Sequence, residues 1–507
     1  MPDKRIRSAF PGKATVAVCV GLCLFATAPA AAPDWELVDL RARLSALSDA
    51  LREDSQLRDT PVQDLIAGLG LPELDGLKVP PAAAATPIAP VDMGWIDKRH
   101  ALSAMSQIYG GTRNRTVMEA GRAGDTEALE IRAGVATLND LRQRLTARHL
   151  GRDLGTGAEI LRVPIVVGRD ATLRLNQDET LLLGQRDGAF IVNFGRLEVF
   201  GAEISADREH DEAAKEFAPF IATVGSGTVY VSGATFRRLG FGFTAKFAGF
   251  SILAHPTMLP DGRNRIENSR FDDLVTVALV GVRHVELRGN RFFDMRRNPI
   301  LISRSPDAVV EANLISGATP TNAIRVANGS VGTHLVQNIV LEGSRAGLLI
   351  SSGSDNVNVE RNLIWRRNGG GIKLYNVDCG QVAENLILDD KQKGIEVRSS
   401  TDALLRDNRI IGNHNAGVWV SANTPDTQTY VLGNLLRENG SGISAASGGS
   451  IALVGNDLSN QFPRFLDGDI THQFRAVIED LHGRNPIRLE SGVVRPDHQY
   501  YPVHCKS

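Results

Sequence analysis

A short apolar run returns every 22–26 residues through the second half of the chain, each time directly after an asparagine. A repeat of this length, with short strands and no helical period, is typical of a β-solenoid. Leucine-rich repeats have a similar length, but their fixed Leu-x-x-Leu-x-Leu frame is missing here. The pattern therefore predicts an all-β fold, a right-handed parallel β-helix. The asparagines that define the repeat are Asn268, Asn290, Asn313, Asn338, Asn362, Asn385, Asn408, Asn434 and Asn456.

There is a physical reason for an asparagine at this position of each coil. Each coil turns a corner at which backbone N–H and C=O groups face inward without a strand partner. An asparagine that stacks on the asparagines of the neighbouring coils satisfies these groups, and it tolerates the left-handed backbone that corners often need. Coils of a β-helix lie about 4.8 Å apart, so the repeat predicts a ladder of amides along the molecule.

Changes in composition and in the spacing of apolar residues divide the rest of the chain into segments. We expect the β-helix to span residues 127–460, with a helix near residues 137–148 and a cap and tail over residues 461–507 that cover its open ends. Residues 35–53 place leucines at spacings of 3, 4, 3 and 4, which predicts an amphipathic helix within an N-terminal helical region, residues 31–78. Packing of this helix on its own protein is favoured over docking or dimerisation, and the sequence leaves open whether it docks onto an export complex. Residues 79–126, with a Pro/Ala run over 79–90, are expected to form a linker and an irregular segment.

Residues 1–30 are typical of a secretory signal peptide, with a basic start, a short apolar stretch and the small-residue site Ala28-Pro29-Ala30. The protein is therefore expected in the periplasm, without a membrane span in its mature form. Removing these residues takes away four bases and one acid and leaves a net charge of −5, which does not favour a nucleic-acid partner. Of the four cysteines, Cys379 and Cys505 remain, and the sequence leaves open whether they pair.

A second strand precedes each asparagine corner, and the alternation of its residues assigns an inner and an outer face. The inward pairs are Ile300/Ile302, Ile324/Val326, Leu348/Ile350, Ile372/Leu374, Ile395/Val397 and Val418/Val420. The outward pairs are Leu301/Ser303, Arg325/Ala327, Leu349/Ser351, Lys373/Tyr375, Glu396/Arg398 and Trp419/Ser421. One face of neighbouring coils is thus predicted to carry cations and aromatic rings.

These outward residues suit a sugar polymer that carries carboxylates. Exposed Trp and Tyr rings offer flat apolar surface with a polar tip, and Arg binds a carboxylate through two parallel hydrogen bonds. We therefore predict that Arg304, Arg325, Glu396 and Trp419 bind an acidic polysaccharide. The plainer interpretation is a solvated face on which Glu396 only pairs with Lys373.

Between about residues 127 and 460 the chain resembles the periplasmic mannuronan (alginate) C5-epimerases. The segments that carry the resemblance, in the order found in that family, are LRVPIVVGRDATLRL, GAFIVNFGRLEVFGAEI, GSGTVYVSGATFRRLGFG and NHNAGVWV. The resemblance implies a β-helix that binds the polymer along one face and inverts C5 of mannuronate within it. It also implies removal of the C5 proton beside a carboxylate that an arginine neutralises, and return of a proton to the opposite face.

The chain departs from that family at its decisive motif. The family's Asp-Pro-His-Asp, followed by Arg-Ser, aligns with Ile300–Ser303 followed by Arg304 and Ser305, so the histidine and both aspartates are replaced. The family's carboxylate-binding arginine aligns one coil later with Ala327-Asn328, although Arg325 is close enough to substitute. Because an aliphatic side chain cannot accept a proton, the family's reaction cannot run unchanged with these residues.

Another set of residues could carry chemistry on the same face. β-Helical polysaccharide lyases offer a precedent in which a lysine on one coil is the base and an arginine on the next completes the site. Lys373 and Arg398 stand about one coil apart, and Tyr375 beside them can donate or accept a proton. These three residues are the candidate catalytic groups. Two cations on adjacent coils also occur by chance.

Three functions follow as hypotheses: a C5-epimerase-like enzyme with a rebuilt site, which the extent of the resemblance favours, a polysaccharide lyase, and a non-catalytic scaffold that guides or protects an exopolysaccharide during export. No cofactor is expected. No His/Cys cluster has the spacing of a zinc site, and no glycine-aspartate calcium repeat is present, so no metal is predicted. His414 lies in an Asn/Gly-rich corner and is interpreted as a turn residue.

Overall fold

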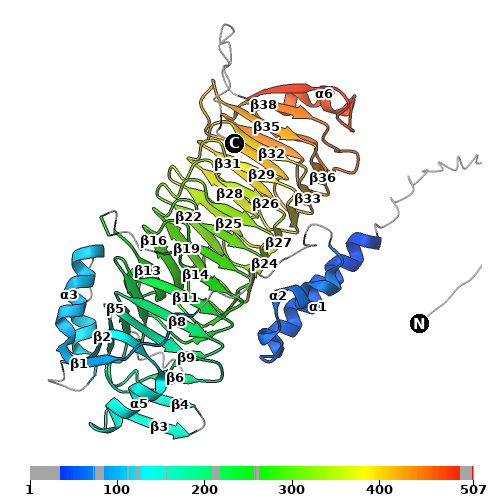
Figure 1. Ribbon diagram of the computed structural model, residues 1–507. Helices are drawn as coiled ribbons and strands as arrows, with labels where there is room; N and C mark the ends of the chain where they lie inside the picture. The colour runs from blue at the N-terminus through cyan, green and yellow to red at the C-terminus, as the bar shows by residue number, and fades with distance from the viewer. Residues whose placement is uncertain are drawn as a thin grey trace, which may run out of the picture.

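The computed structural model describes residues 35–71, 74, 85–110, 114–121, 126–155, 157–207, 217–255, 257–258, 262–491 and 505. The predicted signal peptide, residues 1–30, lies outside the described residues. From β5 (Ile165–Leu175) onward the chain winds into a parallel β-helix, in which each strand pairs with its counterpart one coil away (Figure 1). Ile300, for example, pairs with Ile324. The predicted parallel β-helix is confirmed.

Each coil contributes one strand to each of three faces. Face 1 consists of β13 (Gly249–Leu253), β16 (Thr276–Val280), β19 (Ile300–Ser303), β22 (Ile324–Ala327), β25 (Leu348–Ser351), β28 (Ile372–Tyr375), β31 (Ile395–Arg398), β34 (Val418–Ser421) and β37 (Ile443–Ala446). Face 2 consists of β14 (Arg265–Glu267), β17 (Glu286–Arg288), β20 (Val309–Glu311), β23 (His334–Val336), β26 (Asn358–Glu360), β29 (Gln381–Ala383), β32 (Ala403–Arg406), β35 (Gln428–Leu432) and β38 (Gly449–Val454). Face 3 consists of β15 (Arg270–Asp272), β18 (Arg291–Phe293), β21 (Leu314–Ser316), β24 (Ile339–Gly343), β27 (Leu363–Arg367), β30 (Leu386–Leu388), β33 (Arg409–Ile411) and β36 (Leu435–Arg437).

Earlier coils are less regular. Their strands are β4 (Ala158–Leu161), β6 (Thr180–Leu183), β7 (Ile191–Asn193), β8 (Arg196–Phe200), β9 (Glu203–Ala206), β10 (Ile221–Val224), β11 (Thr228–Ser232) and β12 (Thr235–Arg237). The core runs through the middle of all coils. Ile300, Ile302, Ile372 and Leu374 have no exposed surface, and the other predicted inward residues of face 1 are equally buried. The alternation of face 1 is therefore confirmed.

The amide ladder runs along the corner between faces 2 and 3. Each side-chain Nδ2 of Asn290 to Asn434 donates to the Oδ1 of the next asparagine at 2.9–3.0 Å, and the ladder ends at Asn456. The prediction is wrong for Asn268. Ser269 takes that rung, and its backbone N–H donates to Asn290 Oδ1 at 3.0 Å. Asn268 instead supplies the left-handed residue before the corner, with φ 50°, the other use that a corner has for asparagine.

A second polar ladder, which the sequence did not predict, lies at the corner between faces 3 and 1. Asn413 Nδ2 donates to Asn439 Oδ1 at 2.9 Å, and Asn439 Nδ2 donates to Gln461 Oε1 at 3.1 Å. Asp390 holds the rung before Asn413 and is buried. Arg367 lies one coil earlier, and its buried guanidinium donates to backbone oxygens of Thr321 and Arg345. Burial lowers the pKa of Arg367 to about 10.

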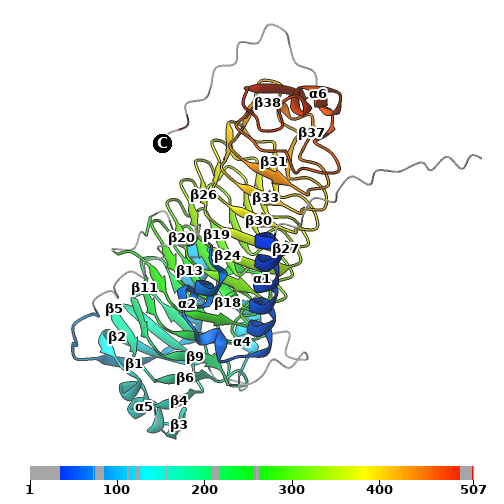
Figure 2. The same cartoon turned by 90° about the vertical axis from the view of Figure 1, so that its right-hand side faces the viewer.

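The N-terminal helical region covers face 3. It consists of α1 (Trp35–Glu53), η1 (Leu57–Asp59), α2 (Val62–Ile66) and η2 (Ala67–Leu69), and α1 lies along the face (Figure 2). Leu37, Leu40, Leu44 and Leu51 are buried against apolar residues of face 3 such as Trp365. Arginines at the rim fix the contact, among them Arg41, which donates twice to Asp389 at 2.6 and 2.9 Å. The leucine stripe thus packs on its own β-helix.

Regular elements replace the expected irregular segment at residues 79–126. After residues 85–90, the chain forms β1 (Asp92–Asp97), α3 (Lys98–Tyr109) and α4 (Asn114–Glu119). β1 pairs antiparallel with β2 (Glu127–Ala136), and its Trp95 packs against the main core. The Pro/Ala composition predicted a linker, but Thr86 is held by Glu198, whose Oε1 accepts its backbone N–H at 3.0 Å.

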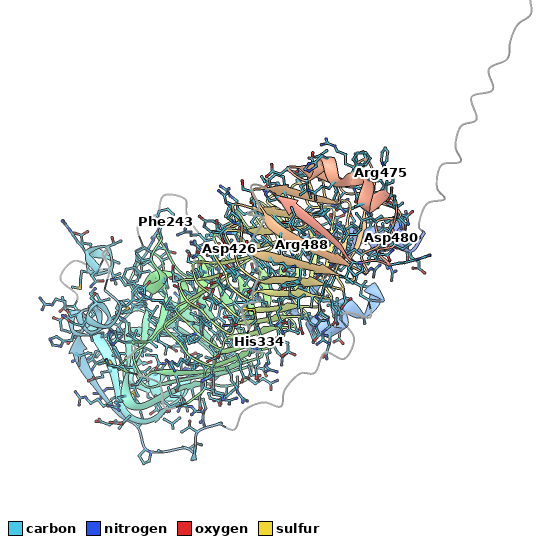
Figure 3. All side chains as sticks on the ribbon, turned by 90° about the horizontal axis from the view of Figure 1, so that it is seen from above. Phe243, His334, Asp426, Arg475, Asp480 and Arg488 are labelled. Atoms are coloured by element: carbon cyan, nitrogen blue, oxygen red, sulfur yellow. A yellow bond between two sulfur atoms is a disulfide. The ribbon has the colours of Figure 1, made fainter. Side chains whose placement is uncertain are left out.

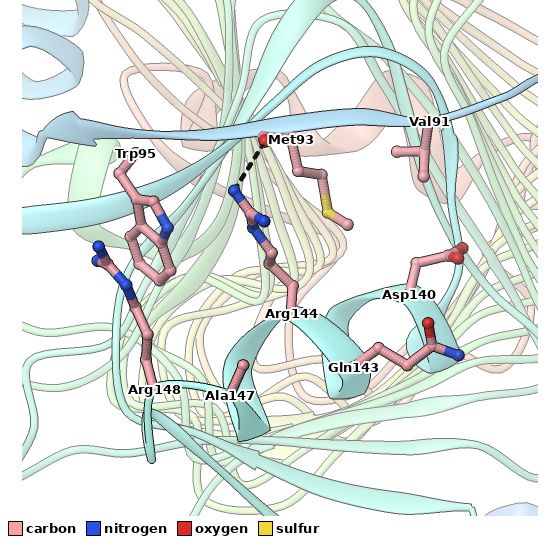
Figure 4. Close-up of a pocket in the computed structure, with 8 residues that line it drawn as sticks. All are labelled: Val91, Met93, Trp95, Asp140, Gln143, Arg144, Ala147 and Arg148. Carbon is pink, nitrogen blue, oxygen red and sulfur yellow. Dashed lines mark hydrogen bonds between the residues drawn. The ribbon is translucent and has the colours of Figure 1, made fainter.

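Both ends of the β-helix are covered. At the N-terminal end, α5 (Leu138–Thr146) begins with a capping box between Thr137 and Asp140 and is followed by the β3 (Gly151–Gly155) and β4 hairpin. A cavity between β1 and α5 is spanned by its own side chains: Arg144 donates to the Met93 oxygen at 3.3 Å, and Arg148 stacks on Trp95 (Figure 4). At the other end, after β39 (Leu466–Gly468), η6 (Thr471–Gln473) and α6 (Phe474–Ile478), β40 (Ile487–Ser491) pairs antiparallel with β38.

Cys379 and Cys505 form a disulfide, which answers the question that the sequence left open. None of the helices in the described part of the chain has the length and hydrophobicity of a membrane span.

Candidate functional site

The outward residues of face 1 form two rows along the axis of the β-helix. The first row pairs in register from coil to coil through Leu301, Arg325, Leu349, Lys373, Glu396 and Trp419. In the second row Ser303 pairs with Ala327, and farther along Tyr375 pairs with Arg398. The prediction that these residues share one face is confirmed. Arg304 lies beside the rows, in the corner directly after β19, where its φ is 53°.

The side chains of the two rows differ in exposure. Arg304, Arg325 and Arg398 are exposed, and Tyr375 is 47% exposed. Lys373 and Trp419 are half-buried. Within the described residues, no carboxylate lies within ion-pair distance of Arg304 or Arg325, so both guanidinium groups are free to meet an anion.

Glu396 is the buried centre of the site. Its side chain is 10% exposed, and its two carboxylate oxygens lie 2.9 Å from Lys373 Nζ and 2.9 Å from Lys393 Nζ. Burial acts to raise the pKa of Glu396, but the two ammonium groups more than offset burial and hold the pKa below its ordinary value. Glu396 therefore does pair with Lys373, as the plainer interpretation expected. Its carboxylate also holds Lys393, so it fixes both lysines in place.

Lys393 was missed by the sequence analysis. Its Nζ lies 4.5 Å from the centre of the Trp419 ring, so it joins Glu396 to the aromatic surface. The residue lies in the corner before β31, where strand alternation assigns no face. Its position three residues before Glu396 was the available signal. The second row has a similar pair, since Arg398 lies 5.8 Å from the centre of the Tyr375 ring.

A Glu396→Gln variant is expected to be less stable than the parent by about 1–3 kcal/mol at neutral pH, because two charge-assisted contacts are lost. The folded state holds the Glu396 proton less tightly than the unfolded state does. Its stabilisation is therefore present above the unfolded pKa and is lost as the pH falls through the lower, folded pKa. Denaturant unfolding from pH about 6 down to about 3 measures this.

The control is Glu479→Gln, which changes an exposed glutamate paired with Arg475. We expect the stability difference between the Glu396 variant and the parent to shrink as the pH falls, and the control to follow the parent throughout. A constant difference at all pH values would contradict the role given to the Glu396 charge.

The corner after β19 differs from the rest of the site. Ser303 stands at the last position of the aligned Asp-Pro-His-Asp motif, and Asn328 stands where the resemblance places an arginine. Asn328 Nδ2 donates to Ser303 Oγ at 2.9 Å. The two positions thus bind each other as neutral groups, and neither supplies a base or a positive charge.

Face 1 between β19 and β34 is consequently electropositive. Five cations, Arg304, Arg325, Lys373, Lys393 and Arg398, are balanced by a single carboxylate, Glu396. Trp419 and Tyr375 lie among these charged residues on the same face. The arrangement can bind an extended anion along the axis and stack rings against two aromatic side chains. Elsewhere in the described residues, no group of three His, Cys, Asp or Glu is placed to hold a metal ion.

Comparisons with known proteins agree with this architecture. Residues 224–364 match the family model of the right-handed β-helix region, and residues 333–471 match that of the periplasmic copper-binding protein NosD. The chain is 25% identical over 372 residues to a mannuronan C5-epimerase of Pseudomonas putida, an alignment that covers 67% of this chain and 70% of that protein. It is 24% identical over 405 residues to the Pseudomonas aeruginosa enzyme of that name, which covers 73% and 74%.

A solved structure shares the fold. The crystal structure of the periplasmic alginate epimerase AlgG matches with a TM-score of 0.62 and 18% identity, over 75% of this chain and 94% of that one. The sequence relatives and the shared β-helix agree with the resemblance carried by the four segments of residues 127–460. The chain is a divergent relative of the mannuronan C5-epimerases, and it lacks the Asp-Pro-His-Asp motif.

Proposed function

We propose that the protein binds a uronate-containing polysaccharide along face 1. The observation that supports this most is the row of outward residues that ends in Lys373, Glu396 and Trp419, because it sets a lysine, the glutamate that holds it and a ring on three successive coils. Toward the N-terminal coils, Arg325 lies in the same row and Arg304 beside it, and neither guanidinium group has a carboxylate partner among the described residues. The relatives named mannuronan C5-epimerase support a uronate polymer as the ligand class.

The place of action that we propose is the periplasm. Residues 1–30 have the pattern of a secretory signal peptide. A similar solved structure is that of a periplasmic alginate epimerase. The disulfide between Cys379 and Cys505 suits an oxidising compartment.

Binding is tested by titrating purified protein with oligomers of mannuronate and guluronate, with neutral dextran as the control polymer. Arg325→Ala and Arg398→Ala are each expected to weaken binding about fivefold to tenfold, because each removes an arginine that contacts a carboxylate. Trp419→Ala is expected to weaken it about threefold to tenfold through loss of a stacking surface.

The matched control is Arg475→Ala, which removes a cation from α6 in the C-terminal cap, outside face 1 (Figure 3). Affinity that falls equally in the control, or that stays unchanged in all three face 1 variants, would contradict binding along face 1.

Binding without chemistry is favoured over the reaction of the relatives by the contact between Ser303 and Asn328. Epimerisation is the second candidate function. It would need Lys373, Tyr375 and Arg398, with Tyr375 moving a proton and Arg398 neutralising the sugar carboxylate. The close ring contact of these two side chains supports that assignment. The ion pair of Lys373 with Glu396 places Lys373 in a supporting position.

One incubation separates the functions. In deuterated water, an epimerase moves deuterium to C5 of the polymer without shortening it, a lyase creates an absorbing unsaturated end, and a scaffold does neither. We expect binding without deuterium incorporation. Deuterium at C5 that disappears in Tyr375→Phe would assign epimerisation to this site instead.

A further inference from the structure

A groove runs beside α1, on a different part of the surface from face 1. It lies where the chain leaves the strands of face 3, and Arg52 of α1 is among its lining residues. Figure 2 shows α1 on this face. The volume of the groove is about 680 Å³, and Arg52 forms one wall. Corner residues of successive coils form the other wall. This groove has no part in the function proposed above.

Three acidic residues line the groove, and each is paired with an arginine of the N-terminal region. Asp389 is bound by Arg41 at 2.6 Å, and Glu342 is bound by Arg52 at 2.7 Å. Asp294 is bound by Arg58 at 2.8 Å. These partners cancel the negative charge of the groove.

Two cations of the groove remain without a carboxylate. In the described part of the chain, no carboxylate lies within ion-pair distance of Arg366 or Lys391, and both side chains are exposed. Arg366 lies with its guanidinium 4.4 Å from the centre of the Trp365 ring, so its direction is fixed without an anionic partner. Arg366 and Lys391 are therefore two lining cations outside the ion pairs that hold the acids of the groove.

The polar side chains of this wall repeat with the coils. Asn368, Lys391 and His414 each stand three residues after Trp365, Leu388 and Ile411, which pair in register on neighbouring strands. Their backbone N–H groups continue the coil-to-coil bonding: Lys391 donates to Arg367 O at 2.8 Å, and His414 to Asp390 O at 2.9 Å. The side chains therefore follow one another at about 4.8 Å along the axis. A row of donors at this spacing suits an extended anionic chain better than a compact anion.

We propose that this groove is a second track for a uronate polysaccharide, in which Arg366 and Lys391 bind sugar carboxylates and Asn368 and His414 bind hydroxyl or carboxylate oxygens. The ligand class rests on the proposed function of face 1, but the residues are separate. A chain of uronates fits the groove because each sugar carries one carboxylate and several hydroxyls. An acidic peptide supplies carboxylates without the hydroxyls, so it is the alternative that the test must separate.

The test uses the full-length protein and short oligouronates, too short to reach both tracks, with binding stoichiometry measured by calorimetry. We expect two sites on the parent protein. The double variant Arg366→Gln/Lys391→Gln should keep one site, with at least about tenfold loss of affinity at the other. Arg325→Ala should weaken the remaining site, and Arg475→Gln should change neither.

The outcomes separate the two proposals. If the parent has one site and the double variant leaves that site unchanged, the proposal for the groove is overturned, while the proposal for face 1 is upheld. If the parent has two sites and only the groove variants weaken one of them, binding along face 1 is overturned and the groove remains as an anion-binding site. Polyglutamate that binds the groove as tightly as oligouronate overturns the sugar assignment. Thermal unfolding of each variant shows that lost binding is not lost folding.

Discussion

Asn385→Ala is expected to lower the free energy of unfolding by about 3 kcal/mol or more, because each buried polar group left without a partner costs about 1–3 kcal/mol. Asn385 Oδ1 accepts from the backbone N–H and from Nδ2 of Asn362, both at 2.9 Å. Its own Nδ2 donates to Asn408 Oδ1 and to the backbone oxygens of Val359 and Ala383. Alanine removes the acceptor of the Asn362 backbone N–H, and it removes a donor from Asn408 Oδ1 and from the backbone oxygens of Val359 and Ala383, all in one buried corner.

Denaturant unfolding followed by far-UV circular dichroism measures this loss. The matched control is Asn415→Ala, which removes an exposed asparagine from a neighbouring corner and should change stability by less than about 0.5 kcal/mol. An equal loss of stability in the two variants would mean that a rung of the amide ladder stabilises the fold no more than an exposed asparagine does.

Asp390→Asn is expected to have the opposite effect and to raise the free energy of unfolding at neutral pH by about 1–3 kcal/mol. Asp390 is buried, its Oδ2 has no donor among the described residues, and burial raises the pKa of the carboxyl well above its ordinary value. It holds the rung before Asn413, where the other rungs are amides. An amide in this place removes the buried charge and offers Asn413 Oδ1 a second donor.

The pH dependence follows from the same residue. The folded state binds the Asp390 proton more tightly than the unfolded state does. The ionised carboxylate therefore lowers the stability of the parent protein increasingly as the pH rises above the unfolded pKa, and the loss levels off above the folded pKa. The gain from Asp390→Asn should therefore be largest at neutral pH and shrink toward pH about 4.

Asp389→Asn is the control for this prediction, because the neighbouring carboxylate is bound by Arg41. We expect it to lower stability by up to about 1 kcal/mol. A destabilising effect of Asp390→Asn at pH 7 would show that the buried carboxylate has a partner that stabilises its charged form.

Most of the repeating architecture could be predicted from the sequence, because it depends on local patterns. The alternation in face 1 gave the buried pairs from Ile300 to Val420, and the asparagine spacing gave the ladder from Asn290 to Asn456. The pattern failed by one residue at Asn268, since a serine can hold a rung when the asparagine before it takes the left-handed position. Composition also failed at residues 79–126, where an apolar surface at the end of the β-helix orders β1 and α3.

The candidate site shows the same division. The sequence by itself determined which residues of face 1 point outward, because a strand side chain can take only one of two faces. Only the tertiary structure decided that Glu396 is buried between two lysines, that Lys393 reaches Trp419, and that arginines of α1 neutralise the acids of the groove. Apart from the contact between Lys393 and Glu396, which lie three residues apart, these contacts join residues on different coils or hundreds of positions apart. Their strength depends on burial, which no local pattern carries.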